Sequence, residues 1–189
     1  VLGREVSKKD IKEIINKSNV EIETFIHGAM CVGYSGRCML SNYLTNRDSN
    51  RGGCSQICRW PFVLYDSNKK KINTKEKFSM AVKDLSLAKH INELIELGVK
   101  SFKIEGRMKS LYYIATVINV YRNIIDSYFD NKKIDNKRYE YILQRCSNRE
   151  NKVQYFKRKP NENEQYFSLA NEISNQDFLG IVLDYDDIN

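Results

Sequence analysis

Four of the five cysteines in this 189-residue chain fall within one stretch of 28 residues. The stretch also contains several glycines, which favour irregular backbone, so we expect a long loop there rather than a helix or a strand. Four thiolates gathered on such a loop are the donor set that a soft metal centre needs. The four cysteines are Cys31, Cys38, Cys54 and Cys58.

The spacing of these cysteines bears on which metal they could hold. Structural zinc sites usually pair cysteines two to four residues apart at both ends, and only Cys54 and Cys58 have that form. The wider separation of Cys31 and Cys38 favours an iron–sulfur cluster held by a long loop. Zinc and unligated core cysteines remain the alternatives. Cys146, which stands apart, is expected to be a small buried hydrophobe.

The odd number of cysteines and the lack of a visible secretory signal favour reduced thiols and a cytoplasmic protein. No apolar run approaches the roughly 18 residues of a membrane helix, so we expect no membrane association. The chain begins at Val1 and ends just after a strand-like run, so we interpret it as a fragment. The missing part or another chain is then expected to cover its strand edges.

Positive charge is concentrated in the first 159 residues. They contain all 31 Lys and Arg and 17 of the 24 acids, which gives a net charge of +14. A polyanionic partner is one explanation, with RNA the leading candidate, and a solvated basic surface is the other. Asp48 is the only acid between Cys31 and Trp60, a stretch that also contains four arginines: Arg37, Arg47, Arg51 and Arg59.

Strand-like and helix-like segments alternate along residues 1–130. We predict helices from Ser7 to Lys17, from Asp84 or Ser86 to Gly98, and from Ser110 to Tyr128, with strands at Val20–Ile26 and Val99–Ile104. This order predicts an α/β fold with parallel strands, either half of an eight-stranded barrel or one side of an open sheet. The loops after Ile26 and Ile104 should then leave the same end of the sheet.

The predicted domain organisation has three parts. Residues 1–130 form a partial (β/α) barrel with the cysteine-rich loop at 28–60. Residues 131–176 form a helical and irregular connector. Residues 177–189 form the first strand of a truncated β domain.

A second motif lies just after the strand predicted over Val99–Ile104. Glu105 stands at its carboxyl end, where it could act as a general base or orient a substrate, and a structural pair with Arg107 or Lys103 is the alternative. Arg107 and Lys109 precede a helix, whose dipole opposes cations at that end unless an anion binds there.

His27 ends a predicted strand and could be an acid–base group, with a hydrogen-bonded structural role as the alternative. Ser35, Ser41 and Ser55 are present, but no pattern pairs one of them with His27 and an acid as a hydrolase requires.

The segment from Glu23 to Ser41 is similar to the defining signature of the collagenase-like peptidase family U-thirty-two. The resemblance continues through four more segments: Ser41–Trp60, Lys83–Leu85, Lys103–Tyr113 and Phe178–Tyr185. Ser147–Tyr155 departs from the family pattern. The resemblance implies the later part of a TIM-like (β/α) barrel followed by the start of a small β-rich C-terminal domain.

The resemblance also implies function. Some relatives are catalogued as peptidases and others hydroxylate RNA, and the cysteine block most resembles the branch that hydroxylates the wobble uridine of tRNA. By that likeness the four cysteines hold a [4Fe–4S] cluster, and the hydroxyl donor is a small molecule such as prephenate. A collagenase-like peptidase is the second hypothesis, and a metal-stabilised RNA-binding module without catalysis is the third.

The hypothesis of an RNA-hydroxylating enzyme assigns three sets of residues. Glu105 and His27 are the candidate catalytic residues. The metal ligands are the four clustered cysteines. Seven cations are candidates for binding RNA or another anion: Arg37, Arg47, Arg51, Arg59, Lys103, Arg107 and Lys109.

Overall fold

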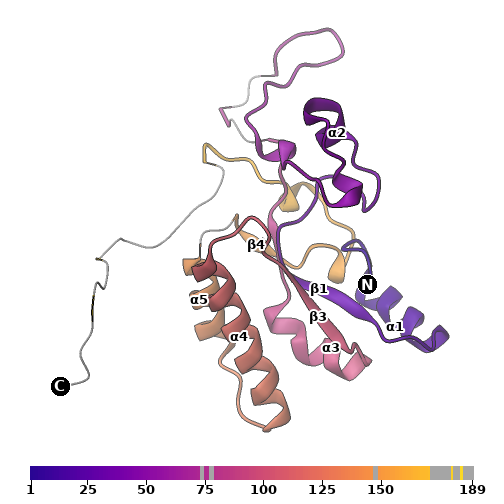
Figure 1. Cartoon of the computed structure of the whole chain (residues 1–189), viewed down its shortest axis with the longest axis vertical. Helices are drawn as coiled ribbons and strands as arrows, with labels where there is room; N and C mark the ends of the chain where they lie inside the picture. The colour runs from indigo at the N-terminus through magenta and orange to yellow at the C-terminus, as the bar shows by residue number, and fades with distance from the viewer. Residues whose placement is uncertain (73–74, 77–78, 147–148, 171–179, 181–183, 185–189) are drawn as a thin grey trace.

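The structure, a computed structural model, describes residues 1–72, 75–76, 79–146, 149–170, 180 and 184. It is a mixed α/β fold in which four strands form one sheet in the order β3-β1-β2-β4. The strands are β1 (Glu23–Gly28), β2 (Asp84–Ser86), β3 (Ser101–Glu105) and β4 (Asn151–Lys152). Five α-helices are found in the described ranges: α1 (Lys8–Lys17), α2 (Leu40–Thr45), α3 (Ile91–Leu97), α4 (Leu111–Phe129) and α5 (Asn136–Arg145) (Figure 1).

The helices at both ends of the predicted barrel segment are confirmed, and their caps explain their bounds. The Ser7 side chain accepts a hydrogen bond from the backbone N–H of Asp10, and the Asp10 side chain returns one, so a full capping box starts α1. Ser110 caps α4 in the same way by accepting from the N–H of Tyr113. Gly98 ends α3 with φ of +94°, as expected of a C-terminal glycine.

The sheet is not uniformly parallel as the alternation predicted. β1 and β3 are parallel, but β2 runs antiparallel to β1, and β4 is parallel to β2. The expectation of a helix opening at Asp84 or Ser86 is also wrong. Both residues belong to β2, and α3 begins only at Ile91, after a 3₁₀ turn at Ala88–His90.

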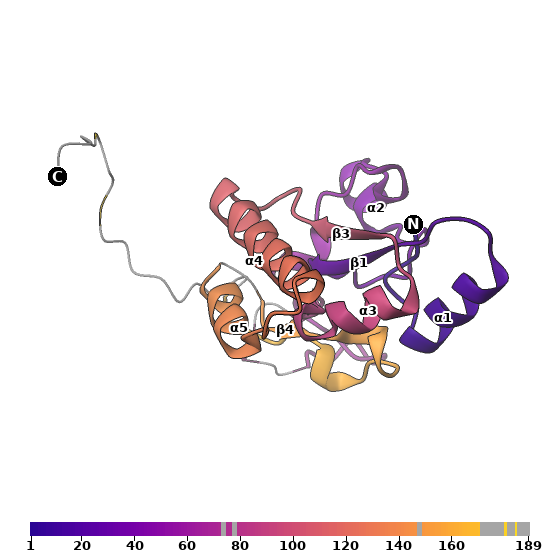
Figure 2. The ribbon, with the colours of Figure 1, turned by 90° about the horizontal axis from the view of Figure 1, so that it is seen from below.

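The hydrophobic core lies between the sheet and the helices α3, α4 and α5. Ile26 of β1 and Leu85 of β2 are buried against Leu94 of α3 and against Val117 and Ile124 of α4. Figure 2 shows α3, α4 and α5 gathered beside the sheet, with α4 in contact with both of the others. The loop that contains α2 lies away from these helices, beyond one end of the sheet (Figure 1).

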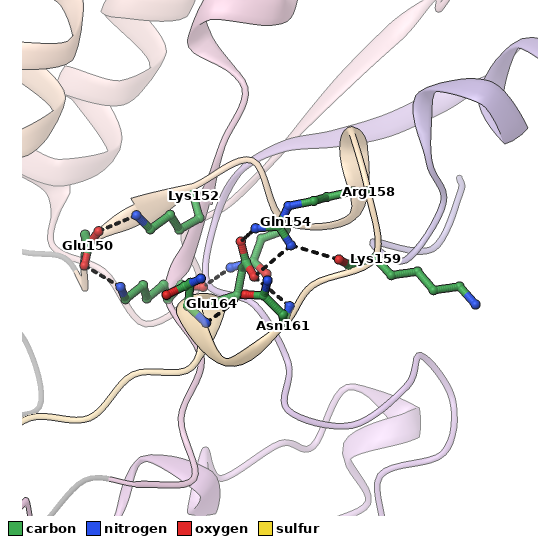
Figure 3. A network of polar contacts seen from close by, with 9 residues as sticks. Glu150, Lys152, Gln154, Arg158, Lys159, Asn161 and Glu164 are labelled. Carbon is green, nitrogen blue, oxygen red and sulfur yellow. Dashed lines mark hydrogen bonds and ion pairs between the residues drawn. The ribbon is translucent and has the colours of Figure 1, made fainter.

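Residues 149–166, within the predicted connector, make polar contacts with the segment around β2. Glu150 forms ion pairs of 2.6 Å with Lys83 and with Lys152, and the Gln154 side chain donates to the backbone oxygen of Lys83. Further along, Glu164 accepts from Arg158 at 2.8 Å (Figure 3). These contacts fix the segment to the sheet. Of the strand predicted over 177–189, only residues 180 and 184 lie among the described residues, so that prediction is not examined by the structure.

Within the described ranges, no helix has both the length and the apolar character needed to cross a membrane.

Candidate metal centre

The two conspicuous loops leave the same end of the sheet, as expected. In the parallel pairing of β1 and β3, Gly28 lies opposite Glu105, so the cysteine loop and the loop after Glu105 start side by side. Gly28 has φ of +113°, and a Cβ atom on it would lie 2.2 Å from the backbone oxygen of Glu105. Only glycine therefore allows the two strand ends to approach this closely.

A Gly28→Ala variant is expected to lose about 2–3 kcal/mol of folding stability, because the added Cβ combines a strained φ with a clash against backbone. Gly36→Ala is the matched control, since Gly36 also has a positive φ of +75° but a Cβ atom on it would meet nothing within 4 Å. Urea unfolding should show a clearly smaller loss for the control. Equal losses would mean that strain alone, and not the approach of Glu105, sets the need for glycine.

All four clustered cysteines line one pocket at this end of the sheet, with a volume of about 380 Å³. The fifth cysteine, Cys146, is buried elsewhere, against α4 and α5. All five are free thiols. The residues that also line the pocket and carry charge are Arg4, Arg59, Glu105 and Arg107.

Side-chain hydroxyls hold the two halves of the cysteine loop together. Ser49 donates to the backbone oxygen of Cys38 at 2.7 Å. Ser41, which is buried, accepts from the backbone N–H of Ser55 at 3.0 Å, and Thr45 and Ser55 share a hydroxyl contact of 2.9 Å. These contacts bring the segment with Cys31 and Cys38 against the segment with Cys54 and Cys58.

The thiols differ in their electrostatic environments. Burial raises the pKa of Cys31, with smaller raising effects from Cys38 and Cys54. Burial also raises the pKa of Cys58, against the opposing charges of Arg59 and Arg149. For Cys38, burial is outweighed by hydrogen bonds, first from Ser49, and its pKa is lowered.

The donor set suits a soft metal in kind, because four thiols line one pocket. The side chains are not already arranged as ligands: in the described ranges, no three His, Cys, Asp or Glu side chains are placed to hold one metal ion. Binding would therefore require the thiols to draw closer together on their loop.

Glu105 lies in the pocket between two arginines. Its carboxylate is 3.1 Å from the guanidinium of Arg4 and accepts the backbone N–H of Arg107, also at 3.1 Å. The Arg107 side chain donates to the backbone oxygen of Gly52 and so links the two loops. Arg4, which stacks 4.1 Å above the Phe25 ring, is missing from the sequence-based assignment, because no local pattern marks a residue that reaches the site from 101 positions away.

The other predicted cations are divided between the protein surface and the interior. Arg37, Arg47 and Arg51 are exposed on the cysteine loop and do not line the pocket. Lys103 is also exposed and lies 3.5 Å from Glu23. Lys109 instead has a buried side chain, 3.9 Å from Asp84.

His27 lies in the core and outside the pocket. Its Nδ1 is 3.1 Å from the hydroxyl of Tyr121, and its ring also packs against Tyr113. Because Tyr121 donates its own proton to the backbone oxygen of Ile26 at 3.0 Å, the His27 Nδ1 is the donor to Tyr121. Burial, followed by the charge of Lys109, lowers the pKa of His27 from 6.5 to about 3. This placement favours the structural role over the catalytic one.

The lowered pKa of His27 predicts a pH dependence of stability. The unfolded chain binds a proton at this residue below about pH 6.5 and the folded chain only near pH 3, so stability is full above 6.5 and is lost as the pH falls. The slope is expected to be up to about 1.4 kcal/mol per pH unit. Urea unfolding between pH 7 and pH 4.5 should show a shallower decline for a His27→Gln variant. Parallel declines would contradict the prediction.

Comparison with known proteins shows the family of the chain. The profile of Peptidase family U32 matches residues 1–166, and the chain belongs to this family. A tRNA hydroxylation protein of Bacillus subtilis is 46% identical over 99% of the chain and 46% of its own length. A 23S rRNA 5-hydroxycytidine synthase of Escherichia coli is 40% identical over 70% of the chain and 20% of its own length. A collagenase of Porphyromonas gingivalis is 40% identical over 58% of the chain and 30% of its own length.

The chain spans half or less of the length of these relatives. No solved structure matches it significantly.

Proposed function

We propose that the protein containing this chain hydroxylates RNA. In its more detailed form, the proposal is that the hydroxylated nucleoside is a uridine of tRNA. The observation that carries the proposal is the single pocket lined by four thiols, one carboxylate and three arginines at the end of the sheet. Two of the similar proteins are named for RNA hydroxylation, one on tRNA and one on rRNA. A small-molecule hydroxyl donor such as prephenate belongs to the same proposal.

In this proposal Cys31, Cys38, Cys54 and Cys58 hold a [4Fe–4S] cluster, with zinc as the alternative. The cluster would supply one-electron chemistry or a site for the oxygen donor. The chain's own groups surround that position. Glu105, held between Arg4 and Arg107, is poised to accept a proton from a bound substrate or to orient one of its hydroxyl groups.

The exposed cations of the cysteine loop are the proposed RNA-contacting groups. Arg37, Arg47 and Arg51 stand on the surface around the pocket, where they can meet phosphates without entering it. Trp60 and Tyr43 of the same loop are exposed, and rings beside arginines can stack unpaired bases. Reduced thiols and an RNA substrate both suit the cytoplasm, which we propose as the compartment.

We further propose that the whole protein forms a TIM-like barrel, to which this chain contributes later strands. The parallel pairing of β1 with β3 supports this proposal. The antiparallel β2 is the feature that such a barrel would have to accommodate. In the described residues β3 lies at one edge of the sheet, and another part of the protein or another chain would then pair with it.

The decisive experiment is mass spectrometry of nucleosides from a strain that lacks the gene for the whole protein. We expect one hydroxylated nucleoside of tRNA or rRNA to disappear and to return when the intact gene is restored. Unchanged nucleosides in both RNA classes would overturn the proposal. If the protein still bound RNA tightly in that case, the RNA-binding module without catalysis would replace it.

Peptidase activity is the second candidate, and the similarity to collagenases favours it. The described residues offer little support, because the buried His27 bonds to Tyr121 and the buried Ser41 accepts a backbone N–H from Ser55. Cleavage of gelatin by the purified whole protein, unaffected by Cys31→Ser but lost with Ser41→Ala, would reverse our order.

A further inference from the structure

A buried arginine near the thiol pocket has N–H groups without acceptors. Arg149 is 0% exposed, and within the described ranges its Nε and Nη1 atoms have no hydrogen-bond partner. Leaving such a donor unsatisfied in the interior is unfavourable because it has lost its hydrogen bonds to water, so nearly all buried polar groups are paired. An arginine that keeps two unpaired nitrogen atoms points to an acceptor that binds there.

Arg149 is held rigidly in place. Its Nη2 donates to Asp84 Oδ1 at 2.7 Å, and its backbone N–H is 3.5 Å from Asp84 Oδ2. The backbone N–H of Asp84 in turn donates to the backbone oxygen of Glu150 at 3.1 Å. Glu150 forms ion pairs with Lys83 and with Lys152, and Figure 3 shows the contact with Lys152. Of the guanidinium nitrogens, only Nη2 donates to Asp84, and Nε and Nη1 are without a partner in the described ranges.

A second cation approaches the same carboxylate from another part of the chain. The Nζ atom of Lys109 lies 3.9 Å from Asp84 Oδ2 and 5.1 Å from the centre of the Tyr113 ring. Its side chain is only 5% exposed. Lys109 belongs to the loop after β3, whereas Arg149 lies two residues before the start of β4 at Asn151. Two cations from separate loops therefore converge on one point of the interior.

This point lies at the same end of the sheet as the thiol pocket. Leu85 of β2 pairs with Gly28, the last residue of β1, so Asp84 stands just beyond the end of β1. Gly28 also pairs with Glu105, which lines the thiol pocket. The Asp84–Arg149 pair and the thiol pocket are thus neighbours across the ends of β1 and β2.

We propose that Arg149 and Lys109 form a binding site for a small oxyanion, either a carboxylate or a phosphate group. An oxyanion accepts N–H bonds from a guanidinium and also compensates buried positive charge, which a water molecule cannot do. Asp84 orients the arginine for this contact. The proposal uses neither the thiols nor RNA, so it stands independently of the proposed function.

The test compares thermal unfolding of the full chain in sodium phosphate, sodium acetate and sodium chloride at equal ionic strength and pH. A ligand that binds only the folded state raises the midpoint in a saturable way. We expect the midpoint to rise by several degrees in phosphate or in acetate relative to chloride. The anion that gives the rise identifies the chemical source of the oxyanion.

Variants assign the effect to the site. Arg149→Met should abolish the anion-dependent rise and Lys109→Met should reduce it. Arg122→Met is the matched control, because Arg122 is an exposed arginine of α4 paired with Asp126, and this variant should keep the full rise. Should Arg149→Met fail to fold, isothermal titration of the wild-type chain with the stabilising anion should still give one saturable site per chain.

Three results would overturn the proposal. The first is a wild-type midpoint that is the same in all three salts. The second is an anion effect that survives in Arg149→Met, which would place the bound anion elsewhere. The third is a titration without a saturable site.

Discussion

A Cys31→Ser variant is expected to retain almost no iron after anaerobic reconstitution with iron and sulfide, whereas the wild-type chain retains it. Cys31 lines the pocket with the other three thiols, and its raised pKa is due first to burial, with smaller raising effects from Cys38 and Cys54. Removing a direct ligand should cost more than the roughly 10–100-fold in affinity that removal of an outer partner costs. Iron, zinc and acid-labile sulfide would be measured on the same samples.

Cys146→Ala is the matched control for this experiment. Cys146 is 0% exposed but lies outside the thiol pocket, so its loss removes a thiol without removing a ligand. It should retain the wild-type content of iron. Equal iron in Cys31→Ser and the wild type would contradict the ligand assignment. Zinc without sulfide in the wild type, lost in Cys31→Ser, would establish the zinc alternative.

Sequence patterns predicted the elements whose signals are local. The helices α1 and α4 carry both an apolar stripe and a serine that caps the first turn, so their N-termini are correct within a residue or two. The strands β1 and β3 were also expected near their observed positions. These elements are long enough for the period of apolar residues to identify them.

β2 was missed for a physical reason. A strand of three residues has no measurable period, and Asp84 and Ser86 are residue types that commonly cap helices. Its conformation is decided by pairing with β1 and with β4, and both pairings depend on contacts distant in sequence. The same limit explains why the sheet was expected to be fully parallel.

The candidate site divides in the same way. The cysteines are close in sequence and could be grouped without a structure, and Glu105 could be placed from the end of its strand. Arg149 could not be found, because its partner Asp84 is 65 residues away and its segment reads as irregular and polar. Lys109 was predicted to bind RNA or another anion, and the structure places its side chain in the interior, 3.9 Å from Asp84.

An Asp84→Asn variant is expected to lose about 3–5 kcal/mol of folding stability, because it leaves Arg149 charged and buried without its counter-charge. Asp84 and Arg149 are both 0% exposed, so water cannot replace the lost partner. Asp126→Asn is the matched control, since it breaks the exposed pair with Arg122 on α4 and should cost less than about 1 kcal/mol. Urea unfolding of the three proteins at the same pH provides the comparison.

The double variant Asp84→Asn with Arg149→Met separates two quantities: the stability that the intact pair contributes, and the stability lost when only one member is removed. Replacing both members of a buried pair by neutral groups often changes folding stability little, whereas removing one member leaves the other charged and without a partner in the interior. The double variant should therefore be more stable than Asp84→Asn alone. If it is less stable by the full sum of the single losses, the two side chains do not depend on one another. A double variant more stable than Asp84→Asn would show that Asp84 is needed because Arg149 is charged and buried. The buried charge would then be explained by the oxyanion proposed to bind the unpaired N–H groups of Arg149.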